Sequence, residues 1–332
     1  MQDKHITLAH GNGGRLMREL IEEIFVRHLD NPFLNTQTDA ALLDTPNGQW
    51  MMTTDGFSVQ PLEFPGGNIG SLAIHGTVND LAVAGAEPMF LSLNVFIEEG
   101  LEISLLDRIV AGMAAAAQEA GVKIVTGDTK VVRKGEGGGL YLATTGLGIQ
   151  KTDQLGINTI CSGDKILVSG PVGDHGTAVM LAREEFGMRG DLQSDSASVA
   201  PLTVALYPQS GLRFMRDPTR GGLASIMQEI HRATGLGIQL KQEAIPVRDP
   251  VQSVCEMLGY DPLYLACEGR VVAVLSPEQA EQALAVWRDL PQGGEAAIIG
   301  TVTDDQHVVM QTPLGGNRIL EELEDEPLPR IC

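Results

Sequence analysis

The sequence has 332 residues, more than one ordinary hydrophobic core serves, which suggests two domains. Its hydrophobic fraction of 43% and charged fraction of 20% are typical of a globular protein, and we expect neither a membrane helix nor a signal peptide at its start. A formal charge of −20 argues against a nucleic-acid surface, because clustered Lys and Arg hold phosphate backbones, so any bound phosphate is expected to come with a metal.

The first half of the sequence predicts strands that alternate with helices. A Gly-rich stretch, "HGNGG", precedes a helix whose apolar residues, such as Leu16, Leu20 and Ile24, recur at helical spacing. Strand-like runs follow at "QWMMTTD", "MFLSLNVFI", "VKIVTGD" and "LYLATTGLGI", and "SLLDRIVAGMAAAAQEAG" predicts a helix that Gly121 caps. Because "MFLSLNVFI" is apolar on both faces, we expect a homodimer that covers it through the first half of the chain.

The pattern restarts after about residue 155 and predicts a second domain. The segments "KILVSG" and "IQL" are strand-like, "DHGTAVMLAREEFG" and "GGLASIMQEIHRATG" are helical, and "RVVAVLS", "PEQAEQALAVWRDL" and "AAIIGTVT" predict strand, helix and strand. Strands alternating with long helices indicate an α/β or α+β fold. We predict a Gly-rich loop and N-terminal helix at 1–40, an N-terminal domain at 41–155, a C-terminal α+β domain at 156–312 and a flexible acidic tail at 313–332.

Four aspartates are predicted at strand ends beside small or hydroxyl residues: Asp55 in "TTDGF", Asp80 in "VNDLAVAGAEP", Asp128 in "TGDTK" and Asp217 in "RDPTRGG". One such Asp is usually a turn residue or a helix cap. Four of them favour Mg²⁺, which prefers hard oxygen ligands and is commonly held by a few carboxylates together with substrate phosphates. The "DPTRGG" turn adds backbone N–H groups at a helix start, where a phosphate can bind.

Other common catalytic patterns are missing from the sequence. It contains no GxxxxGK[ST], no complete GxGxxG and no GxSxG, which weakens the P-loop, Rossmann and hydrolase interpretations. No histidine pair has HxxxH spacing, so His75 and His175 are expected to serve packing or phosphate contact. His10 in "HGNGG" belongs either to a flexible leader or to a lid that orders over phosphates.

The four cysteines are far apart and form no CxxC, which indicates free thiols in a reducing cytoplasm. We expect Cys161, Cys255 and Cys267 to be packed within the domains. Cys332 in "EPLPRIC" is expected to be exposed, because its two prolines favour an extended chain. The residues alone leave open whether this thiol has a function.

Several of these segments together resemble the hydrogenase maturation factors of the HypE family. The resemblance rests on "FPGGNIGSLAIHGTVNDLAVAGAEP", "IVTGDTKVV", "SGPVGDHG", "RDPTRGG", "EG" at Glu268 and Gly269, and "PLPRIC", and it covers essentially the whole chain. The "ND", "GDT" and "TRGG" elements are shared with aminoimidazole ribonucleotide synthetase, selenophosphate synthetase and thiamine-monophosphate kinase. The ending "PRIC" indicates the HypE branch.

The resemblance implies a two-domain, aminoimidazole ribonucleotide synthetase-like α+β fold, in which the N-terminal sheets of two subunits pair into a dimer barrel and ATP lies at the domain and subunit junction. It assigns to ATP binding Asp55, Asn79, Asp80, Asp128, Asp217, Thr219, Gly221 and Gly222. It assigns to Mg²⁺ binding Asp55, Asp80, Asp128 and Asp217. It assigns to catalysis Cys332, Lys130 and Glu268.

By the same resemblance, a carboxamide on Cys332 is dehydrated with ATP to a thiocyanate. The implied partners are the carbamoyltransferase HypF and the HypC and HypD complex, which accepts the cyanide for the Fe(CN)₂CO centre of nickel–iron hydrogenase. A selenophosphate synthetase is the nearest alternative, but that branch carries a reactive Cys or selenocysteine in the loop that is "HGNGG" here. A metal carrier is the other alternative, and it would need a second soft ligand near Cys332.

Overall fold

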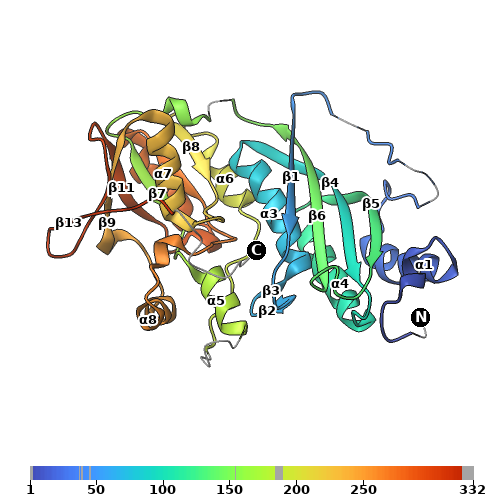
Figure 1. Ribbon diagram of the computed structural model, residues 1–332. Helices are drawn as coiled ribbons and strands as arrows, with labels where there is room; N and C mark the ends of the chain where they lie inside the picture. Colours follow the sequence, from blue (N-terminus) through green and yellow to red (C-terminus); the bar gives the residue numbers. More distant parts are fainter. Residues whose placement is uncertain are drawn as a thin grey trace. The chain divides into compact units, whose positions relative to one another are not determined.

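The computed structural model describes residues 3–36, 38, 40–44, 46–153, 155–183 and 190–323. The described residues divide into two units: one comprises the residues up to Leu81 together with Ala86–Gln150, and the other comprises Ala82–Gly85 and the residues from Lys151 to Leu323. Each unit packs helices on a β-sheet (Figure 1), which confirms the predicted α+β class. The division between the units falls a few residues before the predicted boundary at residue 155.

The first unit contains helices near its start and then a mixed sheet. Its elements are η1 (Leu8–Gly11), α1 (Arg15–Leu20), the π-helical turn η2 (Ile21–Val26), α2 (Arg27–Leu29), β1 (Trp50–Phe57), β2 (Glu63–Phe64), β3 (Gly67–Asn68), α3 (Ile69–Val83), β4 (Ala86–Glu98), α4 (Ile103–Glu119), β5 (Lys123–Val132) and β6 (Leu140–Gln150). The predicted N-terminal helix is therefore present, and its apolar residues Leu20 and Ile24 are buried.

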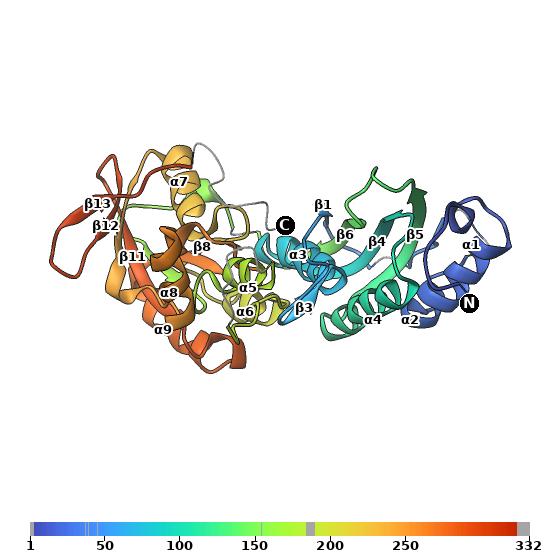
Figure 2. The ribbon, with the colours of Figure 1, turned by 60° about the horizontal axis from the view of Figure 1, so that its bottom comes forward.

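The main sheet of this unit has the order β1-β6-β4-β5, with β4 parallel to β5 and antiparallel to β6. Alternate residues of β4 differ in burial: Leu91, Leu93 and Val95 are buried, whereas Asn94 and Phe96 are exposed. Helices α3 and α4 run along one face of the sheet (Figures 1 and 2). Because successive side chains of a strand point to opposite faces, these helices cover only one of the two faces.

Helix α3 carries two of the predicted site residues, and its start is fixed by a reciprocal cap. The side chain of Asn68 accepts hydrogen bonds from the backbone N–H groups of Gly70 and Ser71 (2.9 and 3.0 Å), and the Ser71 hydroxyl accepts one from the backbone of Asn68 (3.0 Å). Nearly every residue of α3 is buried, so the helix shows no polar stripe. For that reason periodicity did not single it out as a helix.

The second unit has helices on both faces of a larger sheet. Its elements are η3 (Ile157–Thr159), β7 (Lys165–Val168), α5 (Asp174–Ala182), α6 (Ala200–Leu206), β8 (Leu212–Arg216), α7 (Gly222–Thr234), β9 (Gly237–Lys241), η4 (Gln242–Ala244), α8 (Asp249–Leu258), η5 (Pro262–Tyr264), β10 (Val272–Leu275), α9 (Pro277–Arg288), η6 (Pro291–Gly293), β11 (Ala297–Thr303), β12 (Val308–Gln311) and β13 (Asn317–Ile319). The strand order of the sheet is β13-β12-β9-β11-β7-β10-β8.

Burial on both faces explains why the central strands are continuously apolar. In β10, Val272 and Val274 pack in one hydrophobic cluster with helix α7, while Ala273 and Leu275 pack in a second cluster with α6 and α9. In that second cluster, the indole N–H of Trp287 donates to the carbonyl of Leu202 (2.9 Å) and joins α9 to α6. A strand buried on both sides needs apolar residues at every position.

Strand β13 changes one expectation about the end of the chain. Residues 313–332 are predicted to be a tail, yet Asn317–Ile319 pair with β12 and Leu320 is buried in the core. Ordered structure therefore extends at least to Leu320. The part of the predicted tail from residue 324, including Cys332, lies outside the described residues.

No helix in the described ranges has both the length and the apolar character needed to span a bilayer.

Candidate active site

Asn79 and Asp80 lie side by side near the end of helix α3. Asn79 is fully buried, and the half-buried carboxylate of Asp80 accepts a hydrogen bond from the hydroxyl of Thr53 in β1 (2.8 Å). The next residue of β1 on the same face is Asp55, whose carboxylate accepts the N–H of Gly56 (2.8 Å). The fold therefore places Asp55 and Asp80 at one face of the sheet.

Asp128 and Lys130 lie on β5, at the edge of the sheet, and both are exposed. The strand register places Gly127 of β5 in the same row across the sheet as Asp55 of β1, through Thr144 and Leu93. Asp128 is the next residue after Gly127, so its side chain points to the opposite face from Asp55. Three strand spacings, or about 14 Å, separate the backbones of β1 and β5. A single unit therefore does not bring Asp55 and Asp128 together.

A cavity of about 390 Å³ adjoins Asp128 in the first unit. Its polar rim includes Asp128, Thr126 and Thr129, and its apolar wall comes from the N-terminal helices, including Ile21 and Phe25. The start of the chain is held against the same strand, because a Cβ on Gly11 would lie 2.8 Å from the side chain of Val131. The "HGNGG" stretch thus borders the edge of β5.

The predicted placement of the acids at strand ends is wrong for three of them. Asp55 and Asp128 lie inside β1 and β5, and Asp80 lies in helix α3; only Asp217 directly follows a strand, β8. For Asp55 and Asp128, the physical reason is that pairing with neighbouring strands continues β1 and β5 past Asp and Gly residues, which usually end strands. Among the described residues, no three His, Cys, Asp or Glu side chains converge as metal ligands. The assignment of all four acids to one metal site stays a prediction.

In the second unit, "DPTRGG" forms the turn between β8 and α7. Asp217 is buried, and its carbonyl accepts the N–H of Thr219 (3.0 Å). Gly221 and Gly222 have φ values of +67° and +60°, a left-handed conformation that favours glycine. The turn therefore presents its backbone just before the N-terminus of α7, as expected for a phosphate-binding turn.

We expect Gly222→Ala to lower the free energy of unfolding by at least about 3 kcal/mol, because the new methyl group would meet two carbonyl oxygens in a left-handed conformation. Its Cβ would lie 2.6 Å from the carbonyl oxygens of both Leu263 and Leu265. Gly235→Ala is the matched control: its φ is +72°, nothing lies within 4 Å of the new Cβ, and its cost should be about 1 kcal/mol. Urea denaturation measures both, and equal costs would contradict the steric argument.

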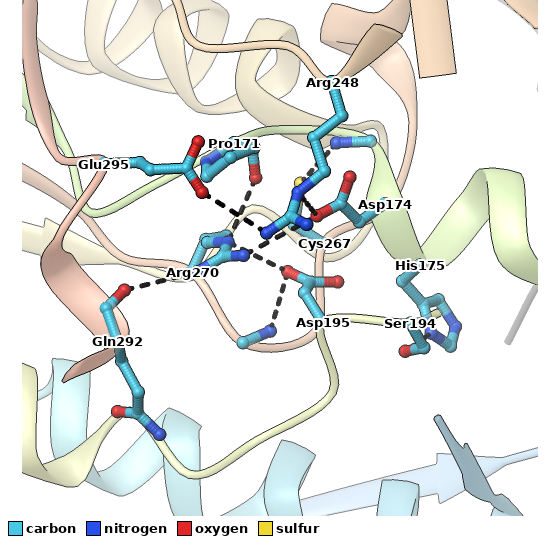
Figure 3. Close-up of polar contacts among 12 residues, drawn as sticks. Pro171, Asp174, His175, Ser194, Asp195, Arg248, Cys267, Arg270, Gln292 and Glu295 are labelled. Atoms are coloured by element: carbon cyan, nitrogen blue, oxygen red, sulfur yellow. Dashed lines mark hydrogen bonds and ion pairs between the residues drawn. The ribbon is translucent and has the colours of Figure 1, made fainter. Parts of the chain in front are cut away.

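Glu268 lies in the segment between η5 and β10 and is 3% exposed. Its backbone N–H donates to the carboxylate of Asp195 (3.2 Å), and the next residue, Gly269, donates to the other oxygen of the same carboxylate (3.2 Å). Figure 3 shows Asp195 opposite the guanidinium of Arg270, which also faces Asp174. Glu268 is therefore part of a rigid polar network and not of an open loop.

Two buried histidines, His75 and His175, remain neutral at physiological pH. Burial lowers the pKa of His75 to about 4 and that of His175 to about 3. Nδ1 of His175 lies 2.8 Å from the hydroxyl of Ser194. Their burial favours packing among the two predicted roles, packing and phosphate contact. His10 is also fully buried, which argues against the flexible-leader alternative for the "HGNGG" stretch.

The three described cysteines differ in reactivity. Cys255 and Cys267 are buried as predicted; burial raises the pKa of Cys255 to about 12 and holds that of Cys267 well above its ordinary value. Cys161 is exposed, so the prediction that it is packed is wrong. It follows η3 in a loop where its N–H donates to the carboxylate of Asp164 (2.8 Å), which leaves the thiol at the surface.

Comparison with known proteins identifies the family. Family models of AIR synthase related proteins match the chain with their N-terminal domain at residues 37–150 and their C-terminal domain at 162–312. The chain is 48% identical over 336 residues to a protein of Azotobacter vinelandii named carbamoyl dehydratase HypE, covering 100% of this chain and 98% of the relative. The chain belongs to the HypE family.

Solved structures of HypE proteins share the fold of this chain. A hydrogenase maturation protein HypE in complex with ATP superposes with a TM-score of 0.93 at 45% identity, covering 98% of this chain and 99% of that one. A structure of a HypE–HypF complex matches with a TM-score of 0.81 at 44% identity, covering 92% of this chain and 99% of that one. The predicted aminoimidazole ribonucleotide synthetase-like fold of this HypE chain is thus confirmed.

Sequence reasoning missed several residues that position the candidate HypE site. Thr53 contacts Asp80, and Asp195 with Arg270 fixes the Glu268 segment. Asp195 is 73 residues before Glu268 in the sequence and lies in "SDSAS", which suggests a polar loop. No local signal in that stretch predicts a buried carboxylate.

Proposed function

We propose that this chain is an ATP-dependent carbamoyl dehydratase, which converts a carboxamide carried on the sulfur of Cys332 into a thiocyanate. The observation that carries the proposal is 48% identity over the full chain to a protein named carbamoyl dehydratase. The TM-score of 0.93 to a HypE solved with ATP supports ATP as the co-substrate. The thiocyanate supplies the cyanide ligands of the nickel–iron hydrogenase centre.

The reaction balances as two successive steps. The carboxamide oxygen attacks the γ-phosphorus of ATP, ADP leaves, and the nitrogen loses one proton, which gives an S-linked imidate phosphate. The C–O bond to phosphate then breaks, the second nitrogen proton is removed, and a C≡N group remains on sulfur. ATP thereby turns the amide oxygen into a good leaving group, since the oxygen departs as phosphate rather than as water.

The proposed contacts to ATP are Asp55, Asn79, Asp80 and Asp128 of the first unit and Asp217, Thr219, Gly221 and Gly222 of the second. Carboxylate oxygens suit Mg²⁺, and the lack of a convergent acidic cage among the described residues fits an ion held by one or two carboxylates together with phosphates. Asp55, Asp80, Asp128 and Asp217 are the proposed ligands; because Asp128 faces away from Asp55 and Asp80, we propose that it binds the same ion only through a second copy of the chain. When bound, Mg²⁺ would supply neutralising charge for the phosphates.

Lys130 and Glu268 carry the proposed charge and proton roles. The ammonium group of exposed Lys130 would offset negative charge that develops on the carboxamide oxygen. Glu268 would take the nitrogen protons as phosphate departs. Its buried, hydrogen-bonded segment supports this role, because a base acts best when its direction is fixed.

The proposed partners follow the same assignment. A solved complex pairs a relative with HypF, which supports a HypF-type carbamoyltransferase as the source of the carboxamide. The HypC and HypD complex would accept the cyanide. We propose that the chain works in the cytoplasm, where a reducing environment keeps the Cys332 thiol free.

The proposed function is tested by intact-mass measurement. The chain is loaded by a HypF-type carbamoyltransferase with its carbamoyl donor, is separated from all nucleotide, and is then given Mg·ATP. The expected result is a carbamoyl adduct that maps to the peptide containing Cys332 and then loses one water after ATP is consumed. An adduct whose mass ATP leaves unchanged would exclude the dehydratase.

We further propose that two copies pair through the sheet face that α3 and α4 leave uncovered. Met52, Phe96 and Tyr141 lie on this face with exposed fractions of 72%, 43% and 40%. The register places Lys130 beside Phe96 on the same face. Pairing would bury this apolar patch and also bring Lys130 to the interface.

Light scattering tests the dimer. We expect a dimer at micromolar concentration for the unchanged chain and a monomer for Met52→Asp, because β1 is three strands from the strand that carries Lys130 and the new carboxylate would be buried without a partner. Met257→Asp is the matched control, since Met257 is 65% exposed on α8 of the other unit and should leave the dimer intact. A monomeric unchanged chain would contradict the proposal.

A further inference from the structure

The carboxylate of Asp195 binds two successive peptide N–H groups of the Glu268 segment. The N–H of Glu268 donates to Oδ1 and that of Gly269 donates to Oδ2, both at 3.2 Å. Two such bonds to one rigid carboxylate fix the orientation of the peptide that joins these residues. They thereby fix the direction in which the side chain of Glu268 leaves the backbone.

The two segments are also in direct backbone contact. The N–H of Ala197 lies 3.4 Å from the carbonyl oxygen of Glu268 and donates to it. A Cβ at Gly269 would lie only 1.8 Å from the carbonyl oxygen of Asp195, so only glycine permits this approach. The Glu268 segment therefore packs directly against residues 195–197.

A buried arginine supports the charge of Asp195. The side chain of Asp195 is 1% exposed, and its carboxylate lies 3.5 Å from Nε of Arg270. That same Nε donates to the carbonyl of Pro171 (3.0 Å), which holds the guanidinium in place (Figure 3). Burial raises the pKa of Asp195, while Arg270 and the two backbone N–H groups oppose that rise.

We propose that Asp195, whose carboxylate lies against the guanidinium of Arg270, is a positioning residue for Glu268. This inference rests on the proposed function, in which Glu268 takes protons from the carboxamide nitrogen. A proton acceptor must lie within hydrogen-bond reach of that nitrogen, so a small rotation of the Glu268 peptide should slow the chemical step. ATP binding depends on other residues and should not change.

Asp195→Asn is the decisive variant, because a carboxamide can accept only one of the two N–H groups and turns an N–H donor of its own toward the other. The chain is preloaded with carbamoyl at Cys332 by the HypF-type carbamoyltransferase, and single-turnover dehydration is followed at saturating Mg·ATP. We expect the rate constant to fall at least tenfold while the KM for ATP stays within twofold. An unchanged rate constant would overturn the inference.

Asp174→Asn is the matched control. Asp174 is also about 2% exposed and also faces Arg270, at 3.6 Å, but the hydrogen bonds of the Glu268 segment go to Asp195 and not to it. Burial raises the pKa of Asp174 to about 6, so this side chain takes up a proton, and becomes neutral like an amide, at a higher pH than an ordinary Asp. We expect its rate constant to stay within twofold, and a loss equal to that of Asp195→Asn would overturn the specific role of Asp195.

A double-mutant cycle separates this inference from the proposed function. If Glu268→Gln alone leaves dehydration at the wild-type rate, the proposed role of Glu268 fails. If Glu268→Gln slows the reaction, we expect Asp195→Asn to add less than twofold in that background, because both changes remove the same contribution. A further tenfold loss there would show that Asp195 does not act through Glu268, and would overturn the positioning role alone.

Arg270→Lys provides a second test if Asp195→Asn does not fold. Lysine keeps the positive charge but cannot hold Asp195 and the Pro171 carbonyl with the planar geometry of a guanidinium. We expect a loss of at least threefold in the dehydration rate constant with an unchanged KM for ATP. A wild-type rate constant in the folded variant would count against the proposal.

Discussion

Cys332→Ala is expected to abolish carbamoyl loading completely. The thiolate is the nucleophile that receives the carbamoyl group, and alanine has no atom that could replace it. Intact-mass measurement with the HypF-type carbamoyltransferase and carbamoyl phosphate should show an adduct on the unchanged chain and no adduct on the variant. An adduct of the same yield on Cys332→Ala would contradict the assignment of this thiol.

Cys161→Ser is the most demanding control for this prediction. Cys161 is the exposed thiol in the described part of the chain and therefore the strongest competitor for the carbamoyl group. Cys255 and Cys267 compete poorly, because burial raises the pKa of both thiols. Loading and dehydration should be unchanged in Cys161→Ser, and an adduct that disappears in this variant would move the site of modification away from Cys332.

Asp80→Asn is expected to lower the rate of ATP turnover at least about 100-fold, because an amide supplies no charge to hold a cation against the phosphates. The fold should tolerate the change, since the new side chain can still accept the hydrogen bond from Thr53. Turnover is measured as phosphate release from the carbamoylated chain across a Mg²⁺ titration. If Asp80 binds the ion, the Mg²⁺ concentration at half-maximal rate should also rise.

Thr53→Val distinguishes the charge of Asp80 from its orientation. This variant removes the hydroxyl that donates to Asp80 at 2.8 Å but leaves the carboxylate in place. We expect no more than about a fivefold loss, because the carboxylate keeps its charge and loses only one hydrogen bond. A folded Asp80→Asn variant with wild-type turnover and Mg²⁺ dependence would exclude Asp80 from the site.

The fold was predictable wherever one local signal agreed with the tertiary environment. The amphipathic pattern of Leu16, Leu20 and Ile24 gave the N-terminal helix, and the continuously apolar run at 272–275 gave a central strand. Periodicity failed at α3, because a helix buried on nearly all sides has no polar stripe. The predicted strand ends at Asp55 and Asp128 were also wrong, because pairing with neighbouring strands continues β1 and β5 past residues that usually end a strand.

The sequence by itself determined the chemistry: the motifs indicated the family, a phosphate-binding turn at 217–222 and a candidate thiol at Cys332. Only the tertiary structure decided which side chains share a face, so that Asp55 and Asp80 lie at one face of a sheet and Asp128 and Lys130 at the other. Only the structure showed that Asp195, beside Arg270, accepts the backbone N–H groups of Glu268 and Gly269. The reason is physical: residue types and short spacings follow from local sequence, whereas contacts between residues far apart in the chain depend on strand register and burial.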